Sequence, residues 1–182
     1  MKNMTLERIT EVCGGVYYGS EADKRKNCGS CDRQQTGRVR ISFIAVKGEK
    51  VDGHQFIPQV FEKGALAVLS EQELSEPAAY IRVESTLGAM KNLAAYYRRS
   101  LDIKVVGITG SVGKSSTKEM IASVLSQKYN VLKTEGNFNN EIGLPLTILR
   151  SGSSMKWQCL RWEFQNSVRC TVWLKWHIRI SV

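Results

Sequence analysis

Two kinds of hydrophobic pattern alternate along the chain. Short runs of β-branched and other apolar residues predict buried strands at 16–18, 41–46, 65–69, 80–83, 103–108 and 131–132. Apolar residues that recur every three or four positions predict helices at 5–13, 56–63 and 141–149, and helices that begin at 86 and 114. Strands that alternate with helices favour an α/β fold. A change of module near residue 85, or in the helix just after it, gives two domains, 1–85 and 86–182.

Three of the predicted helices have distinct apolar faces. In the first, Thr5 is the expected N-cap, Cys13 is expected in the core, and the inward residues are Leu6, Ile9 and Val12. The helix that Thr86 is expected to cap has one face made of Leu87, Met90, Leu93 and Tyr97. The helix that begins at Lys114 has one face made of Met120, Ile121, Val124 and Leu125.

The segment from 103 to 120 joins a strand, a glycine loop and a helix. The apolar run ends in Gly110-Ser-Val-Gly113, and the helical pattern begins directly afterwards with Lys114 and Ser115. Glycines let backbone N–H groups converge on phosphate oxygens, and a helix N-terminus adds partial positive charge. This order is typical of a phosphate-binding loop, in which Lys114 reaches the outer phosphates and Ser115 ligates Mg²⁺.

The loop fits the short pattern G-x-x-G-K-S. In the longer pattern G-x-x-x-x-G-K-[ST], the first glycine would fall on Ile108, and Gly107 misses it by one position. A glycine-rich turn that binds no phosphate is the alternative interpretation.

Length and hydropathy point to a cytoplasmic protein. A chain of 182 residues holds one large or two small domains with a proper core. No apolar run approaches the roughly 20 residues of a membrane span. The amphipathic N-terminus carries Glu7 and Glu11, which is not the pattern of a signal peptide.

The net charge of +9 is concentrated in two segments. Residues 24–42 and 150–182 each carry a net charge of +5, so the remainder carries −1. The same segments hold four of the five cysteines and all four tryptophans. The overall positive charge would suggest nucleic-acid binding, but its confinement to two segments argues against that function. The composition of these two segments differs from that of the rest of the chain, and this difference needs another explanation.

Two sequence motifs and the spacing between them are more specific evidence of function than the composition. Residues 107–120 (GITGSVGKSSTKEM) and 136–147 (GNFNNEIGLPLT) resemble motifs of the Mur ligases of peptidoglycan synthesis. FIAVKGE at 43–49 and DGH at 52–54 resemble the uridine-nucleotide domain of that family. The resemblance covers about 1–26 and 43–150. It implies a small N-terminal α/β uridine-nucleotide domain, then the start of a truncated P-loop-type α/β ATP-binding domain.

The resemblance implies an ATP-dependent amide-bond ligase with a role in cell-wall synthesis, cell shape and cell division. Within the family the match is to the member that adds D-alanyl-D-alanine to UDP-N-acetylmuramoyl-tripeptide, acting as a cytoplasmic monomer. ATP phosphorylates the terminal carboxylate of the tripeptide, and the amine of D-alanyl-D-alanine then attacks the acyl phosphate. Whether the third peptide residue is diaminopimelate or lysine stays open.

Motif matching implies the site residues. Lys114 is the catalytic cation, which neutralises developing charge, and Ser115 holds Mg²⁺. The residues implied to bind ATP are Gly110, Ser111, Val112, Gly113, Lys114, Ser115, Ser116, Asn137 and Asn140. Asn137, Asn139 and Asn140 lie in the asparagine-rich turn of the family, where a turn held by side-chain-to-backbone hydrogen bonds is the alternative to ligand contact.

The two segments of unusual composition lack motifs that the family has there, and a shift of the reading frame would explain why. The family has an Asp-Ser-Arg motif shortly before the strand at Phe43, and a shifted reading of codons 32–37 permits I-D-S-R-Q. From Met155, the other shifted frame permits E-M-A-V-F-E-M-G, which contains the Glu-x-Gly of the family's metal-binding glutamate. The hypothesis is that about 27–42, and 151–182, are read in the wrong frame.

Other interpretations of these segments are weaker. Cys28 and Cys31 have the spacing of a metal knuckle, with Cys159, Cys170 and His177 as conceivable partners, but a second tight pair is missing. A basic tail rich in tryptophan could bind nucleic acid or a membrane surface. His54 and His177 have no constellation that supports a catalytic base, and His54 is expected in a turn.

Two function hypotheses follow. The first is a Mur-type ligase. The second is a non-catalytic nucleotide-binding remnant, because the sequence lacks the Glu-x-Gly glutamate in frame and the rest of the family's central and C-terminal domains. A P-loop kinase or GTPase is more distant, because the asparagine-rich motif has no role there.

Overall fold

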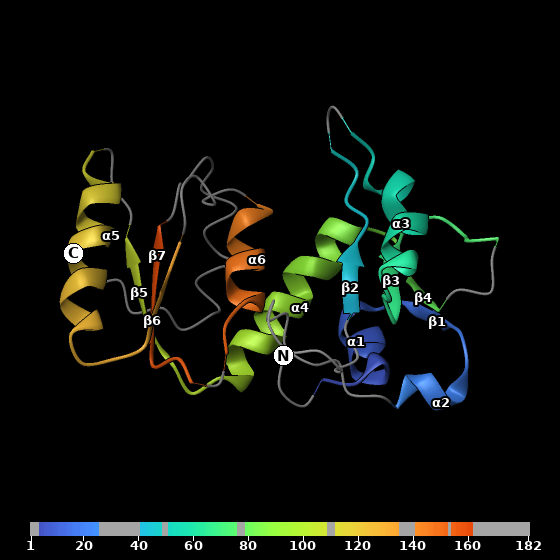
Figure 1. Cartoon of the computed structure of the whole chain (residues 1–182), viewed down its shortest axis with the longest axis horizontal. Helices are drawn as coiled ribbons and strands as arrows, with labels where there is room; N and C mark the ends of the chain where they lie inside the picture. The colour runs from blue at the N-terminus through green and yellow to red at the C-terminus, as the bar shows by residue number, and fades with distance from the viewer. Residues whose placement is uncertain are drawn as a thin grey trace. The chain divides into compact units, whose positions relative to one another are not determined.

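The computed structural model describes residues 4–25, 41–48, 51–75, 79–108, 112–134, 141–152 and 154–161. The chain divides into two compact units, Met1–Leu93 and Ala94–Val182. The division falls inside helix α4 (Thr86–Ser100). Each unit contains a sheet with helices against it (Figure 1). Within the described residues, no helix has the length and apolar character needed to cross a membrane.

The sheet of the first unit has the strand order β1-β4-β3-β2. β2 (Ile41–Ile44), β3 (Ala67–Ser70) and β4 (Tyr80–Arg82) run parallel, and the edge strand β1 (Val16–Tyr18) runs antiparallel to β4. All four strands lie where hydrophobic runs predict them. Every residue of β3 is buried, as expected for an inner strand of a sheet covered by helices on both faces.

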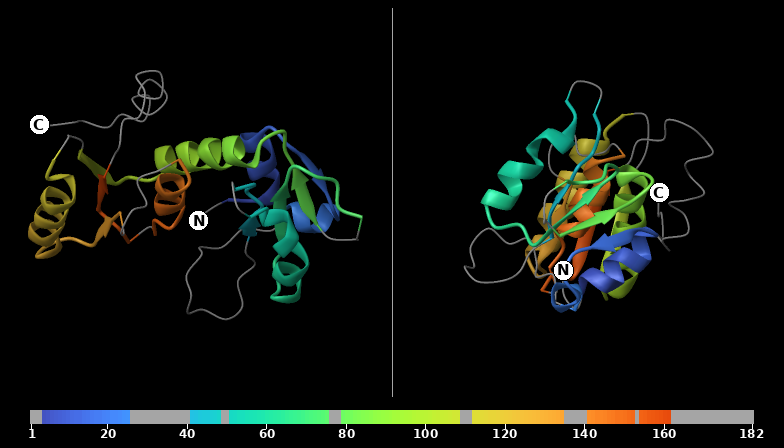
Figure 2. Two further views of the ribbon diagram at one scale, coloured as in Figure 1. Left: turned by 90° about the horizontal axis from the view of Figure 1, so that it is seen from above. Right: turned by 90° about the vertical axis from the view of Figure 1, so that its right-hand side faces the viewer.

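Helices cover the two faces of this sheet. α3 (Ile57–Glu62) lies on one face, and α1 (Leu6–Cys13) and α4 lie on the other (Figure 2). Val68 and Tyr80 form a core cluster with Ile57 of α3. Leu69 is the next residue of β3 and points to the opposite face, where the buried side chains of α1 and α4 lie. α2 (Glu21–Lys24) and the 3-10 helix η1 (Gly53–Phe56) complete the unit.

The first helix confirms its predicted cap and most of its predicted face. The Thr5 side chain accepts a hydrogen bond from the Arg8 N–H at 3.2 Å. Leu6 and Ile9 are fully buried and Cys13 is buried, whereas Val12, expected inward, is only partly buried.

Helix α4 has its cap one residue earlier than expected. The Ser85 hydroxyl oxygen accepts a hydrogen bond from the Gly88 N–H at 3.2 Å, so Ser85 and not Thr86 is the capping side chain. Thr86 is buried and its hydroxyl is a donor to Glu71, at 2.9 Å. The predicted face is confirmed at Met90, Leu93 and Tyr97, which are buried.

The second unit has a parallel sheet with the order β5-β7-β6. β5 (Lys104–Ile108) and β6 (Val131–Lys133) lie where they are predicted. The strand between them, β7 (Trp157–Arg161), was not predicted, because its segment has no clear alternation. α5 (Lys114–Ser126) lies on one face of the sheet and α6 (Gly143–Leu149) on the other (Figures 1 and 2).

The predicted apolar face of α5 is partly wrong. Met120 and Val124 are 70% and 72% exposed. The face against the sheet is a stripe at intervals of three, one and three residues, made of Lys118, Ile121, Ala122 and Leu125. The difference arises because a lysine occupies a buried position, which hydrophobic periodicity cannot anticipate.

Candidate phosphate-binding site

The site begins where β5 passes into α5. Gly113 is the N-cap of α5 and adopts a left-handed conformation, with φ 82° and ψ −6°. A residue with a Cβ is strained in that conformation, so glycine is required there. Because glycine has no side chain to cap the helix, the N-terminal turn favours an external anion.

The described site residues lie at the N-terminus of α5, with Val112 and Gly113 before its first turn and Lys114, Ser115 and Ser116 on it. Val112 is 90% exposed, and Ser115 and Ser116 are exposed, while Lys114 is partly buried. An exposed hydroxyl beside a lysine at a helix N-terminus fits the needs of a nucleoside phosphate with its Mg²⁺. Gly110 and Ser111, predicted to bind the same phosphates, lie outside the described residues.

The parallel sheet directs two loops to one edge. β5 ends at Ile108, just before the glycine loop, and β6 ends at Lys133, just before the asparagine-rich segment. Because parallel strands share the edge at which their carboxyl ends lie, both segments leave the sheet on the same side. Asn137, Asn139 and Asn140 themselves lie outside the described residues.

A buried lysine beneath this edge was missed by the sequence analysis. Lys118 is 3% exposed, and its Nζ donates to the Thr134 carbonyl oxygen at 2.5 Å. Its Nζ also lies 3.0 Å from Oε1 of Glu119, whose other oxygen pairs with Lys133. Hydrogen bonds from Lys133, which has the largest effect, and from Lys118 hold the pKa of Glu119 below its usual value. The signal in the sequence is a cation one helical turn after Lys114, within the stripe that faces the sheet.

The middle strand β7 contains a poorly accommodated residue. Gln158 is fully buried, and its Oε1 atom has no hydrogen-bond partner among the described residues. Its Nε2 donates to the Ser151 hydroxyl oxygen. A buried amide oxygen without a partner costs about 1–3 kcal/mol. Leu160 lies near the carboxyl end of β7, beside Gly107 of β5, and is buried.

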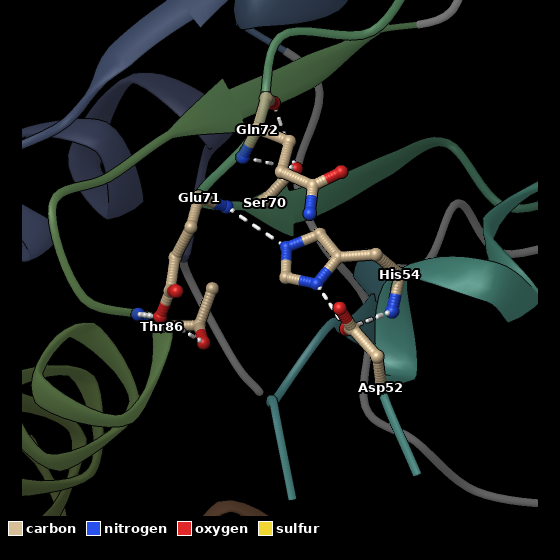
Figure 3. A network of polar contacts seen from close by, with 6 residues as sticks. All are labelled: Asp52, His54, Ser70, Glu71, Gln72 and Thr86. Atoms are coloured by element: carbon tan, nitrogen blue, oxygen red, sulfur yellow. Dashed lines mark hydrogen bonds and ion pairs between the residues drawn. The ribbon is translucent and has the colours of Figure 1, made fainter.

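His54 belongs to a structural network in the first unit (Figure 3). Its Nε2 accepts a hydrogen bond from the Glu71 N–H at 3.1 Å, so Nδ1 carries the proton and donates to Asp52 at 2.6 Å. The Asp52 carboxylate also accepts from the His54 N–H at 3.0 Å. Since the basic nitrogen of the imidazole is occupied by a backbone amide, the position of His54 in a turn is confirmed and a role as general base is disfavoured.

The same network anchors the start of α4. The Glu71 carboxylate accepts from the Thr86 N–H at 2.8 Å and from its hydroxyl at 2.9 Å. Ser70 accepts from the Gln72 N–H at 3.0 Å and thereby holds the turn after β3. The corner at Asp52, the end of β3 and the N-terminus of α4 are thus connected through polar contacts (Figure 3).

We expect Asp52→Asn to lower the melting temperature at pH 7 and to have little effect in acid. Two hydrogen bonds from His54 lower the pKa of Asp52, and the bond from the His54 backbone N–H has the larger effect. The Asp52 carboxylate therefore stabilises the fold above its unfolded-state pKa, and this stabilisation is lost as the pH falls through its folded-state pKa. Melting temperatures between pH 2 and 7 should show the difference shrinking below about pH 4. The exposed Asp102→Asn is the control. A difference that persists at pH 2 would contradict the role of the carboxylate.

No group of three potential metal-ligating side chains occurs among the described residues. The proposed zinc ligands Cys28, Cys31, Cys170 and His177 lie outside them. Cys159 is buried in β7, and burial raises the pKa of its thiol, which disfavours the thiolate that a zinc site needs. Cys13 is also buried, which raises the pKa of its thiol to about 12.

Two family models match the chain in succession. Residues 41–107 match the Mur ligase family, catalytic domain, and residues 108–156 match the Mur ligase middle domain. The matches begin near the end of the first segment suspected to be out of frame, 27–42. They end shortly after the beginning of the second, 151–182.

Individual proteins agree with these matches. UDP-N-acetylmuramoyl-tripeptide–D-alanyl-D-alanine ligase of Bacillus subtilis is 51% identical over 152 residues, which cover 82% of this chain and 33% of that protein. A crystal structure of MurF from Acinetobacter baumannii aligns with 87% of this chain and 35% of its own, at a TM-score of 0.71 and 28% identity. MurF ligase from Thermotoga maritima in complex with ADP aligns with 77% of this chain and 32% of its own, at a TM-score of 0.65 and 34% identity.

The matches confirm the predicted α/β fold and the predicted family. The chain spans about a third of the length of the relatives it matches. Strands β2 to β6 lie within the matched regions, whereas the edge strand β1 precedes them and β7 begins directly after them. The phosphate-loop motif and the asparagine-rich motif both fall in the middle-domain match. The chain belongs to the Mur ligase family.

Proposed function

We propose that this chain carries the substrate-nucleotide domain and the ATP-phosphate site of an amide-bond ligase of peptidoglycan precursor synthesis. The whole reaction would add D-alanyl-D-alanine to UDP-N-acetylmuramoyl-tripeptide in the cytoplasm, by a monomeric enzyme. The observation that carries the proposal is a left-handed glycine, Gly113, as the N-cap of α5, followed directly by Lys114 and Ser115. The relatives named for this reaction support the choice of substrates.

Each residue of the site has a proposed part. The amides of the glycine loop, Gly110 to Gly113, hold the phosphates, and Lys114 neutralises the charge that develops on the transferred group. Ser115 holds Mg²⁺, which screens phosphate charge when it is bound. Ser116 contributes a hydroxyl on the first turn, and Asn137 and Asn140 contact the nucleotide or shape the turn beside it.

The reaction proposed for the whole enzyme needs no reactant other than ATP, the tripeptide substrate and D-alanyl-D-alanine. A carboxylate oxygen of the tripeptide attacks the γ-phosphorus of ATP, and the bond to the leaving ADP breaks. The amine of D-alanyl-D-alanine attacks the resulting acyl carbon, phosphate leaves, and the amine loses its proton. The products are the amide, ADP and phosphate.

An inactive nucleotide-binding remnant is the second candidate, and β7 favours it. In the proposed shifted frame, an apolar residue replaces Gln158 and a glutamate replaces Leu160. The shifted frame would remove the buried Oε1 atom, which has no partner among the described residues, and would supply a carboxylate near the carboxyl edge of the sheet, beside the end of β5. We therefore infer that 27–42 and 151–182 are read out of frame and that the chain as given does not turn over.

Binding and turnover experiments separate the two candidates. Ligand-observed NMR with MgATP tests the phosphate site, and phosphate release with UDP-N-acetylmuramoyl-tripeptide and D-alanyl-D-alanine tests the ligase. We expect weak MgATP binding and no release of phosphate that depends on the tripeptide. Turnover would favour the ligase and refute the remnant, whereas no binding of MgATP would refute the phosphate site in this chain.

The reading frame is tested on the gene itself. Sequencing of independent template should reveal two compensating frame changes that bracket codons 27–42, and one inserted or deleted base near codon 150 that is not compensated. Uninterrupted codons for the present residues would refute the hypothesis.

A further inference from the structure

We propose that Lys118 is a positioning residue, which fixes Thr134, the residue directly after β6, to the phosphate-loop helix and so holds the first turn of that helix in place for phosphate binding. This inference rests on the proposed nucleotide site. It concerns a residue that lies after the G-x-x-G-K-S pattern and has no role assigned to it above.

The contacts of Lys118 join two elements that supply the site. Lys118 lies on α5, one turn after Lys114, and Thr134 is the residue that directly follows β6. The ammonium donates to the Thr134 carbonyl oxygen at 2.5 Å. The Thr134 N–H in turn donates to the Cys159 carbonyl oxygen of β7 at 3.0 Å. Helix, edge strand and middle strand are therefore connected through the two backbone groups of Thr134.

The burial of the Lys118 ammonium has an energetic cost. Lys118 is 3% exposed and Thr134 is fully buried. A lysine is seldom buried to this extent, because the interior disfavours its charge and an apolar residue would pack there without that cost. A buried charge that is kept despite its cost is expected where geometry matters for function.

The neighbouring charges indicate that the role is geometric and not mainly electrostatic. Glu119 pairs with Lys118 at 3.0 Å and also with Lys133. The Glu119 carboxylate offsets part of the long-range field of the two ammonium groups at the phosphates. What remains specific to Lys118 is its directed hydrogen bond to the segment that leads into Gly136–Asn140.

The test compares Lys118→Met with Lys118→Arg. Methionine keeps the length and removes the charge, so we expect the melting temperature to stay the same or rise while MgATP affinity falls at least tenfold. Arginine retains donors and should recover part of the affinity despite its larger head. A merely structural lysine would instead lower melting temperature and affinity together in the methionine variant, and that result would overturn the proposal, as would an unchanged affinity.

A second measurement needs no nucleotide and separates this inference from the proposed function. Hydrogen exchange followed by NMR should show the Thr134 amide exchanging at least tenfold faster in Lys118→Met, with the amides of β5 unchanged. If the unaltered chain binds no MgATP, the proposed function of this chain fails and the exchange result alone decides. Unchanged exchange at Thr134 would overturn the positioning role.

Discussion

Replacing Lys114 with methionine is expected to weaken MgATP binding at least tenfold. Lys114 lies at the first position of α5, behind the left-handed Gly113, where an ammonium can reach phosphate oxygens. Hydrogen bonds to charged groups contribute about 1.5–3 kcal/mol, which corresponds to about 10- to 150-fold in affinity. Saturation-transfer NMR over a MgATP titration measures the loss even when the affinity of the unaltered chain is weak.

The matched control for this substitution lies at the other end of the same helix. Lys128 is exposed and follows the C-terminus of α5, so Lys128→Met removes the same charge far along the helix from the site. We expect it to leave MgATP binding within about twofold, since exposed charges are strongly screened. Equal losses in both variants would show that net charge, and not the phosphate loop, governs nucleotide binding.

Replacing Gln158 with methionine is expected to stabilise the chain by about 1–2 kcal/mol. Methionine has nearly the same volume as glutamine and removes the amide oxygen that has no partner among the described residues. For a chain of this size, each kcal/mol shifts the melting temperature by about 2–4 °C. Thermal unfolding followed by circular dichroism gives the shift directly.

Two companion variants sharpen the meaning of that result. Ser151→Ala removes the acceptor of the Gln158 amide nitrogen and should destabilise the chain by about 1 kcal/mol, because both ends of a buried amide are then unpaired. Gln59→Met, at an exposed position of α3, controls for the general effect of methionine. If Gln158→Met lowers the melting temperature instead, glutamine is the residue that this strand requires, and the frame hypothesis loses its structural support.

The sequence anticipated the elements with local signals. Thr5 and Gly14 mark the ends of α1 because a side-chain cap and a left-handed glycine act within a few residues of the backbone they stabilise. The strands β1 to β6 are short apolar runs, and the junction of β5 and α5 is marked by Gly113-Lys114-Ser115. Composition also marked the two segments that we assign to a shifted reading frame.

Other features needed the tertiary structure because their partners are distant in sequence. The Glu71 carboxylate that anchors Thr86 lies 15 residues away, and the Thr134 carbonyl that accepts from Lys118 lies 16 residues away. Hydrophobic periodicity placed Met120 and Val124 inward, whereas the sheet selects the stripe that contains Lys118. β7 depends on its pairing with β5 and β6, since its own residues have weak strand character.

The sequence by itself therefore determined the α/β class, the family motifs and the position of the phosphate loop, because these depend on residue type and local spacing. The tertiary structure alone decided which polar groups are buried and what they contact. It identified His54 as part of a structural network, Lys118 as the link between α5 and the end of β6, and Gln158 as a residue out of place. Those assignments follow from desolvation and hydrogen bonding between elements, which no local pattern encodes.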